Sequence, residues 1–385
     1  MNILIVDDNP TNVMLIREIL RKAEYKGIYT AASAKEMYKT LGLDGTGKIA
    51  ANTNESGIDL ILLDMMMPEI DGLEACRHLQ TLPHLRDIPI IMVTAIADAN
   101  TLADALDAGA VDYVTKPINR TELLARIRLA LRLKHEKDWH KERDRHIREE
   151  LRLAASVQYS VLSEPYTDER IQIDAIYQPS EELAGDLYAW FPLDDHRYGI
   201  LFMDMMGHGV SSALLCMFIA SSLRNTVLSG LSPDQVMQAL NNKFQYLHMS
   251  DQLMMYYMTA IYVIVDTKQH TITYANAGHP PGIVVMEDGT VIHLDSTGHP
   301  VGMFPEIEIE TKTVPCSSNY RLALYTDGLF EAADEQMEDA ISGLASLVKD
   351  EKSIQSSAWQ QLFGSKCTRE DDKCLVWAQV GRWSS

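Results

Sequence analysis

The stretch Asp59–Gly72, "DLILLDMMMPEIDG", runs through four consecutive apolar residues and then stops on the carboxylate of Asp64. Such a short apolar run is typical of a strand that is buried on both faces, as in a parallel sheet. In an open parallel sheet, ligands bind beyond the carboxyl ends of the strands. Asp64 is therefore a candidate for a functional site.

Similar apolar runs recur through the first third of the chain and alternate with amphipathic segments. We predict strands at "NILIV", "LILL", "IPIIMV" and "DYV". Helices are predicted near residues 12–22, 34–41, 73–82 and 102–108. This alternation indicates βαβ units, and so an α/β domain with a doubly wound, five-stranded parallel sheet.

Polar residues follow the predicted strands at one edge of this sheet: Asp7 and Asp8 after the first, Asp64 after the third, Thr94 after the fourth and Lys116 after the fifth. Three carboxylates at one edge would repel one another unless a cation lies among them, and Mg²⁺ prefers such oxygen ligands. Asp64 could then attack a phosphoryl group, while Thr94 and Lys116 contact the phosphate oxygens. Each aspartate alone is equally well explained as a cap or turn residue. The whole set favours a phosphorylation site.

The motifs "IVDD", "LILLDMMMPEIDG", "MVTA" and "DYVTKP" resemble the signature of the response-regulator receiver domain, over roughly residues 1–132. The resemblance implies that Asp64 is the phosphoacceptor, that Thr94 and Tyr113 move together as a switch, and that Lys116 contacts the phosphate. It implies a histidine kinase or phosphotransfer protein as partner, and a cis bond between Lys116 and Pro117. It also implies one Mg²⁺ ion held by Asp7, Asp8, Asp64 and the carbonyl of Met66.

Residues 42–57 form a Gly-, Asn- and Thr-rich insertion before the third predicted strand. We predict a solvated loop there. Its "GTGK" lacks the full spacing of a phosphate-binding loop and a preceding strand, so we disfavour a nucleotide site.

Residues 133–162 are predicted to form a helical linker, because the chain contains no Gly or Pro from residue 123 to residue 162. Between Arg132 and Arg152 there are eight Lys or Arg and six Asp or Glu, a near-balanced set. Two copies could pair as a short coiled coil and form a homodimer. The alternative is a solvent-exposed rod that packs on its own domains. The apolar stripe on which pairing would depend is broken: Leu124, Ile127, Leu131, Ile147, Leu151, Ala154 and Val161.

Residues 163–385 change character, with long strand-like runs such as "IQIDAIYQ", "YGILFMDMM", "MTAIYVIVD" and "TITYANA". Further runs are "GIVVM", "YRLALYTDG" and "CLVWAQV", and helices are predicted near 210–228, 233–246 and 340–347. This order indicates an α+β domain, a sandwich of two antiparallel sheets flanked by helices.

Aspartates again stand at strand ends, in "AGDLY", "FMDMMGHG", "LYTDG" and "REDDKCLVW". These are Asp186, Asp204, Asp327 and the pair Asp371 and Asp372. An all-oxygen site of this kind favours Mg²⁺ or Mn²⁺. Two such ions would support hydrolytic removal of a phosphoryl group without a serine or cysteine nucleophile.

These motifs, with "NAGHPPGIVV" and "GHPVGM", resemble the bacterial metal-dependent Ser/Thr phosphatases of the phosphatase 2C superfamily, over roughly residues 150–385. The branch includes sporulation and stress-response enzymes that act on anti-sigma factor antagonists. The resemblance makes Asp186 the ligand that bridges two Mn²⁺ or Mg²⁺ ions, and Asp204 a ligand of the second ion. Asp372 is implied only as an outer-shell residue. The remaining implied ligands are the Leu187 carbonyl, Asp327 and Asp371.

Three residues depart from the family pattern: Ala184, Ala189 and Cys374. None removes a predicted carboxylate ligand, so we expect metal binding and catalysis to be kept. His208 and His279 also fall in family motifs, where either could orient a ligand or make a structural hydrogen bond to a loop, and we do not count them as catalytic residues.

The chain of 385 residues carries 34 Lys or Arg and 54 Asp or Glu, a formal net charge of −20. This balance argues against a non-specific nucleic-acid or acidic-membrane surface. The five cysteines form no C-x-x-C pair, as expected in a reducing cytosol. The apolar segment "SSALLCMFIASSL" is too short to cross a bilayer, and no leader precedes "NILIV", so we expect a cytoplasmic protein.

Together these features predict a response regulator in which phosphorylation of Asp64 controls a Ser/Thr phosphatase. The rival hypothesis is a phosphatase-like adaptor that binds a partner without catalysis. The four retained carboxylates argue against it, because their repulsion costs stability without metal. A transcription factor is disfavoured, since the sequence has no helix-turn-helix signal or basic stripe.

Overall fold

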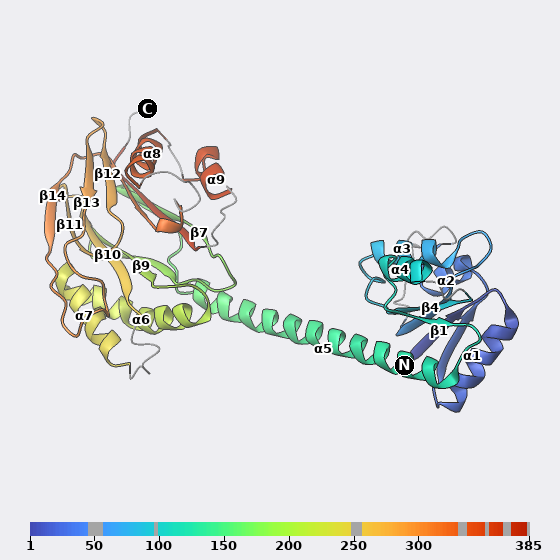
Figure 1. Ribbon diagram of the computed structural model, residues 1–385. Helices are drawn as coiled ribbons and strands as arrows, with labels where there is room; N and C mark the ends of the chain where they lie inside the picture. The colour runs from blue at the N-terminus through green and yellow to red at the C-terminus, as the bar shows by residue number, and fades with distance from the viewer. Residues whose placement is uncertain are drawn as a thin grey trace. The chain divides into compact units, whose positions relative to one another are not determined.

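The computed structural model describes residues 1–44, 57–95, 99–247, 256–329, 337–350, 354–364 and 371–382. The chain divides into two compact units, Met1–His146 and Ile147–Ser385 (Figure 1). Most of the predicted loop at 42–57, namely residues 45–56, lies outside the described residues.

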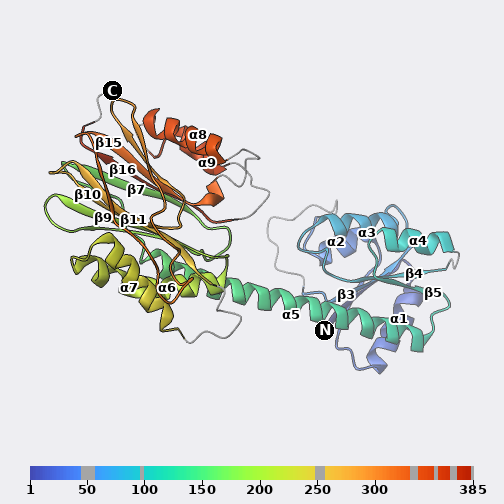
Figure 2. The ribbon, with the colours of Figure 1, turned by 60° about the vertical axis from the view of Figure 1, so that its left-hand side comes forward.

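The first unit is built on a five-stranded parallel sheet with the strand order β2-β1-β3-β4-β5. Helices α1 and α5 pack on one face of the sheet, and α2, α3 and α4 pack on the other (Figure 2). The prediction of a doubly wound α/β domain is therefore confirmed. The strands are β1 (Asn2–Val6), β2 (Gly27–Ala31), β3 (Leu60–Asp64), β4 (Ile90–Thr94) and β5 (Asp112–Thr115), and the helices are α1 (Pro10–Lys22), α2 (Ala34–Thr40), α3 (Gly72–Thr81), α4 (Ala99–Asp107) and α5 (Arg120–Tyr159).

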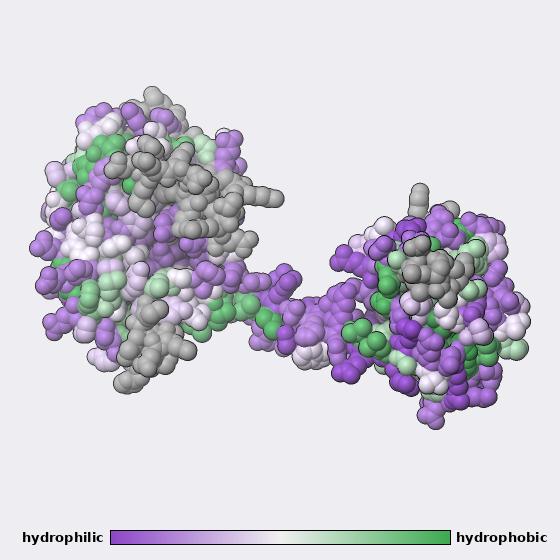
Figure 3. All heavy atoms as spheres, in the orientation of Figure 1, coloured by the Kyte–Doolittle hydropathy of each residue, from purple (hydrophilic) through white to green (hydrophobic). Residues whose placement is uncertain are grey.

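Helix α5 is continuous over 40 residues, as predicted from the absence of Gly and Pro. Its first turns bury Leu123, Ile127 and Leu131 in the core of the first unit, so these side chains are not available for pairing with another helix. The middle of the helix is predominantly hydrophilic (Figure 3). Farther along, Ile147 and Val157 are exposed.

The second unit contains two antiparallel sheets whose inner faces form a common core with residues such as Phe202, Ile261 and Val376. The sheet orders are β14-β11-β10-β9-β8 and β13-β12-β15-β16-β7-β6. The strands are β6 (Tyr166–Thr167), β7 (Ile171–Gln178), β8 (Asp186–Pro192), β9 (Arg197–Met205), β10 (Met258–Asp266), β11 (Thr271–Ala277), β12 (Gly282–Met286), β13 (Val291–Leu294), β14 (Lys312–Pro315), β15 (Tyr320–Tyr325) and β16 (Lys373–Val380).

Helices cover the outer face of each sheet of this sandwich (Figures 1 and 2). Helices α6 (Val210–Leu228) and α7 (Pro233–Gln245) pack on the five-stranded sheet. Helices α8 (Met337–Asp350) and α9 (Ser357–Gly364) pack on the six-stranded sheet. The prediction of a two-sheet sandwich flanked by helices is confirmed.

Within the described residues, one helix, α6, is long and apolar enough to cross a membrane by length and composition. The expectation that this segment is too short was therefore wrong, because the helix extends to 19 residues. Its Ala213, Cys216 and Leu223 side chains are buried against the sheet. A core helix of a globular domain has the same composition.

Candidate functional site

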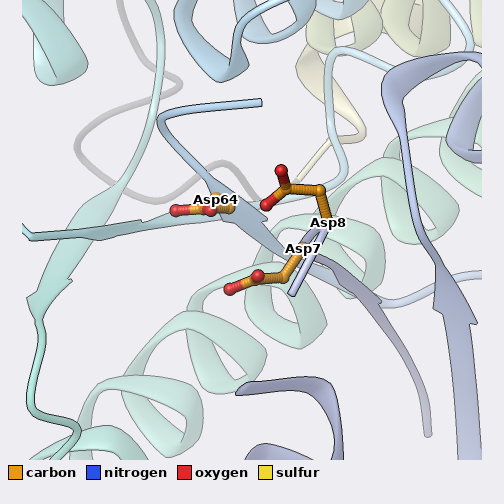
Figure 4. A group of neighbouring side chains, drawn as sticks. All are labelled: Asp7, Asp8 and Asp64. Carbon is orange, nitrogen blue, oxygen red and sulfur yellow. The ribbon is translucent and has the colours of Figure 1, made fainter. Parts of the chain in front are cut away.

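The first carboxylate group lies at the carboxyl edge of the parallel sheet (Figure 4). Asp7 and Asp8 follow β1, and Asp64 is the last residue of β3. One oxygen from each of the three lies within 4.8 Å of the others. Asp7 and Asp64 are buried, whereas Asp8 is exposed to solvent. Three oxygens so close together, one of them open to water, form a set that suits Mg²⁺.

Lys116 joins this group from the loop after β5, where its peptide bond to Pro117 is cis, as the resemblance implies. Its Nζ lies 2.9 Å from Asp64 Oδ1 and 3.0 Å from Asp7 Oδ2. Burial raises the pKa of Asp64, and the hydrogen bond from Lys116 opposes part of that rise. Burial also acts to lower the pKa of Lys116, but its bonds to Asp64 and Asp7 outweigh burial and raise it. The ammonium group is therefore held in its charged form.

Thr94 and Tyr113 lie on the neighbouring strands β4 and β5. Thr94 is fully buried, and its hydroxyl lies 3.5 Å from the sulfur of Met65. The Tyr113 ring lies under the guanidinium of Arg126, whose Cζ is 5.2 Å from the ring centroid. The structure thus places both predicted switch residues near the sheet edge that carries Asp64.

Met66 lies in the loop after β3, and its side chain is 63% exposed. That loop folds back so closely that a Cβ on Gly72 would lie 2.1 Å from the carbonyl oxygen of Asp64. The Gly72 N–H donates to the Met65 carbonyl at 2.9 Å. Gly72 therefore fixes the path of the segment that carries the Met66 carbonyl.

The second carboxylate group begins at the paired ends of β8 and β9, where Asp186 lies opposite Asp204 in the antiparallel register. Asp186 is buried, and its Oδ2 has no hydrogen-bond partner among the described residues. Burial, followed by the charges of Asp204, Asp372, Asp371 and Asp327, raises the pKa of Asp186 well above its usual value. Burial and the charges of Asp327 and Asp371 raise the pKa of Asp204 to about 8. A buried carboxylate with an unsatisfied oxygen, opposite the half-buried Asp204, fits a divalent cation.

Asp327 opens the short 3₁₀ turn η1 (Asp327–Leu329) after β15, and Asp371 and Asp372 directly precede β16. Asp372 uses both oxygens to hold the loop before β8. Its Oδ1 accepts from the Ser180 N–H at 2.8 Å and the Ser180 hydroxyl at 2.9 Å, and its Oδ2 accepts from the Gly185 N–H at 2.8 Å. These contacts suit a residue that supports the loop from outside the ligand set.

Leu187 follows Asp186 on β8, and its side chain is buried. His208 forms an ion pair with Glu181 at 3.3 Å when it is protonated. His279 is buried, and its Nδ1 lies 2.9 Å from the Thr259 hydroxyl. Burial lowers the pKa of His279 to about 3, so the ring stays neutral near pH 7. A neutral, buried ring is in keeping with a structural role.

Gln158, which belongs to none of the motifs described above, contacts the residue two before Asp186. Its side chain bonds to both backbone groups of Ala184. The sequence does contain a hint of this contact. Gln158 lies four residues after Ala154, so a polar side chain occupies a position on the otherwise apolar face of the helix.

Two family models match the chain. The model described as response regulator receiver domain matches residues 3–128, and the model described as stage II sporulation protein E (SpoIIE) matches residues 194–381. The second range includes Asp204, Asp327 and Asp371 and begins after Asp186.

Phosphoserine phosphatase RsbP of Bacillus subtilis (strain 168) is 36% identical over 240 residues, which are 60% of this chain and 58% of that protein. Response regulator PleD of Caulobacter vibrioides (strain NA1000 / CB15N) is 38% identical over 132 residues, which are 34% of this chain and 26% of that protein. The chain thus spans less than two thirds of the length of either relative.

Among solved structures, the SiaA-PP2C domain of Pseudomonas aeruginosa matches 62% of this chain and 98% of its own with a TM-score of 0.51. The sequence identity is 17%, so this match shows the fold alone. Residues 3–128 thus match the response-regulator receiver family and residues 194–381 match the SpoIIE family, and the second unit has the fold of a PP2C phosphatase domain.

Proposed function

We propose that this chain is a two-component response regulator in which phosphorylation of Asp64 controls a metal-dependent protein serine/threonine phosphatase. The observation that carries the proposal is the presence of two separate carboxylate groups, one in each domain. The first combines three carboxylates with Lys116. The second consists of Asp186 and Asp204 at the paired ends of β8 and β9, together with aspartates whose charges raise the pKa of Asp186.

In the receiver, a carboxylate oxygen of Asp64 would attack the phosphorus of a phosphohistidine on a histidine kinase or phosphotransfer protein. The P–N bond breaks, the donor imidazole leaves, and an aspartyl phosphate forms. Mg²⁺, held by Asp7, Asp8, Asp64 and the Met66 carbonyl, would neutralise phosphate charge. Lys116 and the Thr94 hydroxyl would then contact the phosphate oxygens.

In the phosphatase domain, two Mn²⁺ or Mg²⁺ ions would supply an activated water and charge neutralisation when bound. The residues that would hold them are Asp186, the Leu187 carbonyl, Asp204, Asp327 and Asp371. Asp186 lies opposite Asp204 in the sheet, and the charges of Asp371 and Asp327 also raise its pKa, which supports a ligand shared between the two ions. Attack of water on the phosphorus breaks the bond to the serine oxygen, which takes up a proton and leaves as the free hydroxyl.

The substrate in this proposal is a phosphoserine on an anti-sigma factor antagonist, and the output is a stress response. The name of the relative RsbP, a phosphoserine phosphatase, supports the phosphoserine part. The antagonist follows from the resemblance of the motifs to the sporulation and stress-response branch. We place the protein in the cytoplasm, where its kinase and substrate would meet.

Control would pass through α5, because this one helix begins inside the receiver core and its last turn bonds to Ala184, two residues before Asp186. The domain boundaries that we propose are 1–132 for the receiver, 133–162 for the linker and 163–385 for the phosphatase. Exposed apolar side chains near the end of the helix, at Ile147, Leu153, Val157 and Val161, support a homodimer formed through the linker.

The test is hydrolysis of a phosphoserine antagonist protein by the full chain with and without Mn²⁺ or Mg²⁺. The proposal predicts turnover that requires the metal and is lost in Asp186→Asn, a variant of nearly the same volume. Asp194→Asn, in an exposed turn, is the matched control. No turnover by the wild-type protein, together with tight binding of the same antagonist, would favour the adaptor instead.

A further inference from the structure

One side chain at the end of α5 binds both backbone groups of a residue next to the proposed metal site. Gln158 lies in the last turn of the helix and is 1% exposed. Its Nε2 donates to the Ala184 carbonyl at 2.7 Å, and its Oε1 accepts from the Ala184 N–H at 3.1 Å. Ala184 is itself fully buried, so water cannot replace these bonds.

The loop that Gln158 holds leads directly into Asp186. Gly185, between Ala184 and Asp186, donates its N–H to Asp372 Oδ2. A Cβ on Gly185 would lie 3.0 Å from the carbonyl oxygen of Met205, so the backbone is pressed against the end of β9. The residues before Asp186 are thus held by Gln158 on α5 and by Asp372 before β16. A shift of Ala184 would be passed to Asp186 over two peptide units.

A second contact links the same helical turn to Asp186. The Tyr159 ring meets the Tyr177 ring edge-on, with the centroids 5.4 Å apart. The Tyr177 hydroxyl donates to the Asp186 carbonyl at 3.2 Å. The last turn of α5 therefore contacts the Asp186 segment through Gln158 and through the two tyrosines.

We propose that Gln158 is a positioning residue, which sets the Asp186 carboxylate and the Leu187 carbonyl for metal binding by fixing Ala184. A movement of the last turn of α5 would then shift Ala184 and, through it, Asp186, and so would change the metal affinity of the site. This inference rests on the proposed function, since it requires that Asp186 binds a metal. In this inference, the end of the linker helix controls the position of β8, the strand that carries Asp186 and Leu187.

The experiment measures, by titration calorimetry on the full chain, the Mn²⁺ binding that Asp186→Asn abolishes, so that the receiver's own cation site is not counted and no substrate is needed. Gln158→Met keeps the length and approximate volume of the side chain and removes both hydrogen bonds. We expect its Mn²⁺ dissociation constant to rise about 10- to 100-fold, as is typical when a residue that orients a ligand is lost. Raising the Mn²⁺ concentration should restore hydrolysis, because the carboxylates themselves remain.

Ser163→Ala is the matched control. Ser163 makes a similar pair of bonds on the same strand, accepting from the Trp190 N–H at 2.9 Å and donating to the Trp190 carbonyl at 3.4 Å, but at the end away from Asp186. We expect this variant to lose stability and keep its Mn²⁺ affinity. If Gln158→Met does not fold, Gln158→Glu, which keeps an acceptor for the Ala184 N–H, is measured with the same expected direction.

Two outcomes would overturn the inference: an unchanged Mn²⁺ dissociation constant in the folded Gln158 variant, or an equal rise in Ser163→Ala. Either result would make Gln158 a structural residue only. A wild-type protein that binds no Mn²⁺ would instead overturn the proposed function, so the two failures are distinguishable.

Discussion

Lys116 reaches two carboxylates at once, Asp64 and Asp7, and is held charged between them. Because its ammonium would stabilise charge that develops on a transferring phosphoryl group, we expect Lys116→Met to slow phosphorylation of Asp64 about 100-fold. The measurement is phosphorylation by acetyl phosphate and Mg²⁺, followed on a phosphate-affinity gel. Lys134→Met, at an ion pair with Asp138 on α5, should leave the rate unchanged. An equal rate in Lys116→Met would refute the assigned role.

Asp372 accepts three hydrogen bonds from the loop before Asp186. Its replacement in Asp372→Ala leaves a buried N–H at Gly185 without an acceptor, so we expect a loss of about 3 kcal/mol in the free energy of unfolding. Urea denaturation of the metal-free protein measures it. The substitution Asp194→Ala, in an exposed turn, should cost less than half as much; equal losses would mean that Asp372 is no more important than a turn residue.

The predicted site residues were recognisable because strand-end aspartates fall in short, contiguous motifs. Asp7, Asp64 and Asp204 each follow an apolar run that marks its strand. Gln158 and Ser180 were not recognised, because their partners Ala184 and Asp372 lie 26 and 192 residues away in the sequence. Contacts between distant segments leave no local pattern, and only the folded chain shows them.

Helix α5 is tied to the receiver beyond its buried first turns. Lys137 Nζ lies 2.5 Å from Asp87 Oδ1, and Lys141 contacts the other oxygen of Asp87. Hydrogen bonds from Lys137 and Lys141 lower the pKa of Asp87 to about 2. Since an unfolded aspartate has a pKa of about 3.9, this contribution to stability is present above about pH 4 and is lost as the pH falls towards 2.

We therefore predict that Asp87→Asn destabilises the first unit at neutral pH and that the difference from wild type shrinks between about pH 4 and pH 2. Both lysines are more than half exposed, so the effect at neutral pH should be only about 0.5–1 kcal/mol. Urea unfolding across this pH range measures it, with Asp138→Asn on the same helix as the control. A difference in unfolding free energy that grows as the pH falls would contradict the prediction.

Strands with a continuous apolar run and helices with an amphipathic pattern were predictable, whereas three further elements were not. Strand β2 lies at the sheet edge, with Tyr29 and Thr30 exposed, and shows no such run. Strand β8 begins on Asp186, and an aspartate is more typical of a turn than of a strand. Helix α9 has 8 residues and is held mainly by tertiary packing, with Trp359 fully buried. Tertiary contacts, rather than local propensity, determine these three elements.

The whole molecule has two compact units, each with its own core. We expect Mn²⁺ to raise the melting temperature of the unit 147–385. At a Mn²⁺ concentration a hundredfold above the dissociation constant, the free energy of unfolding should rise by up to about 2.7 kcal/mol. Scanning calorimetry of wild type and Asp186→Asn measures this. The variant should lose the Mn²⁺ effect on that unit, and an undiminished effect would place the metal elsewhere.

At the scale of the whole molecule, we propose that the receiver controls the phosphatase. The most direct test is the rate of Mn²⁺-dependent hydrolysis of a phosphoserine antagonist, with and without beryllofluoride as a phosphoryl mimic on Asp64. Asp64→Asn, which cannot accept the mimic in the same way, is the control. We predict that beryllofluoride changes the rate in the wild-type protein and not in Asp64→Asn. Equal rates with and without beryllofluoride, in a protein shown to bind it, would contradict the claim.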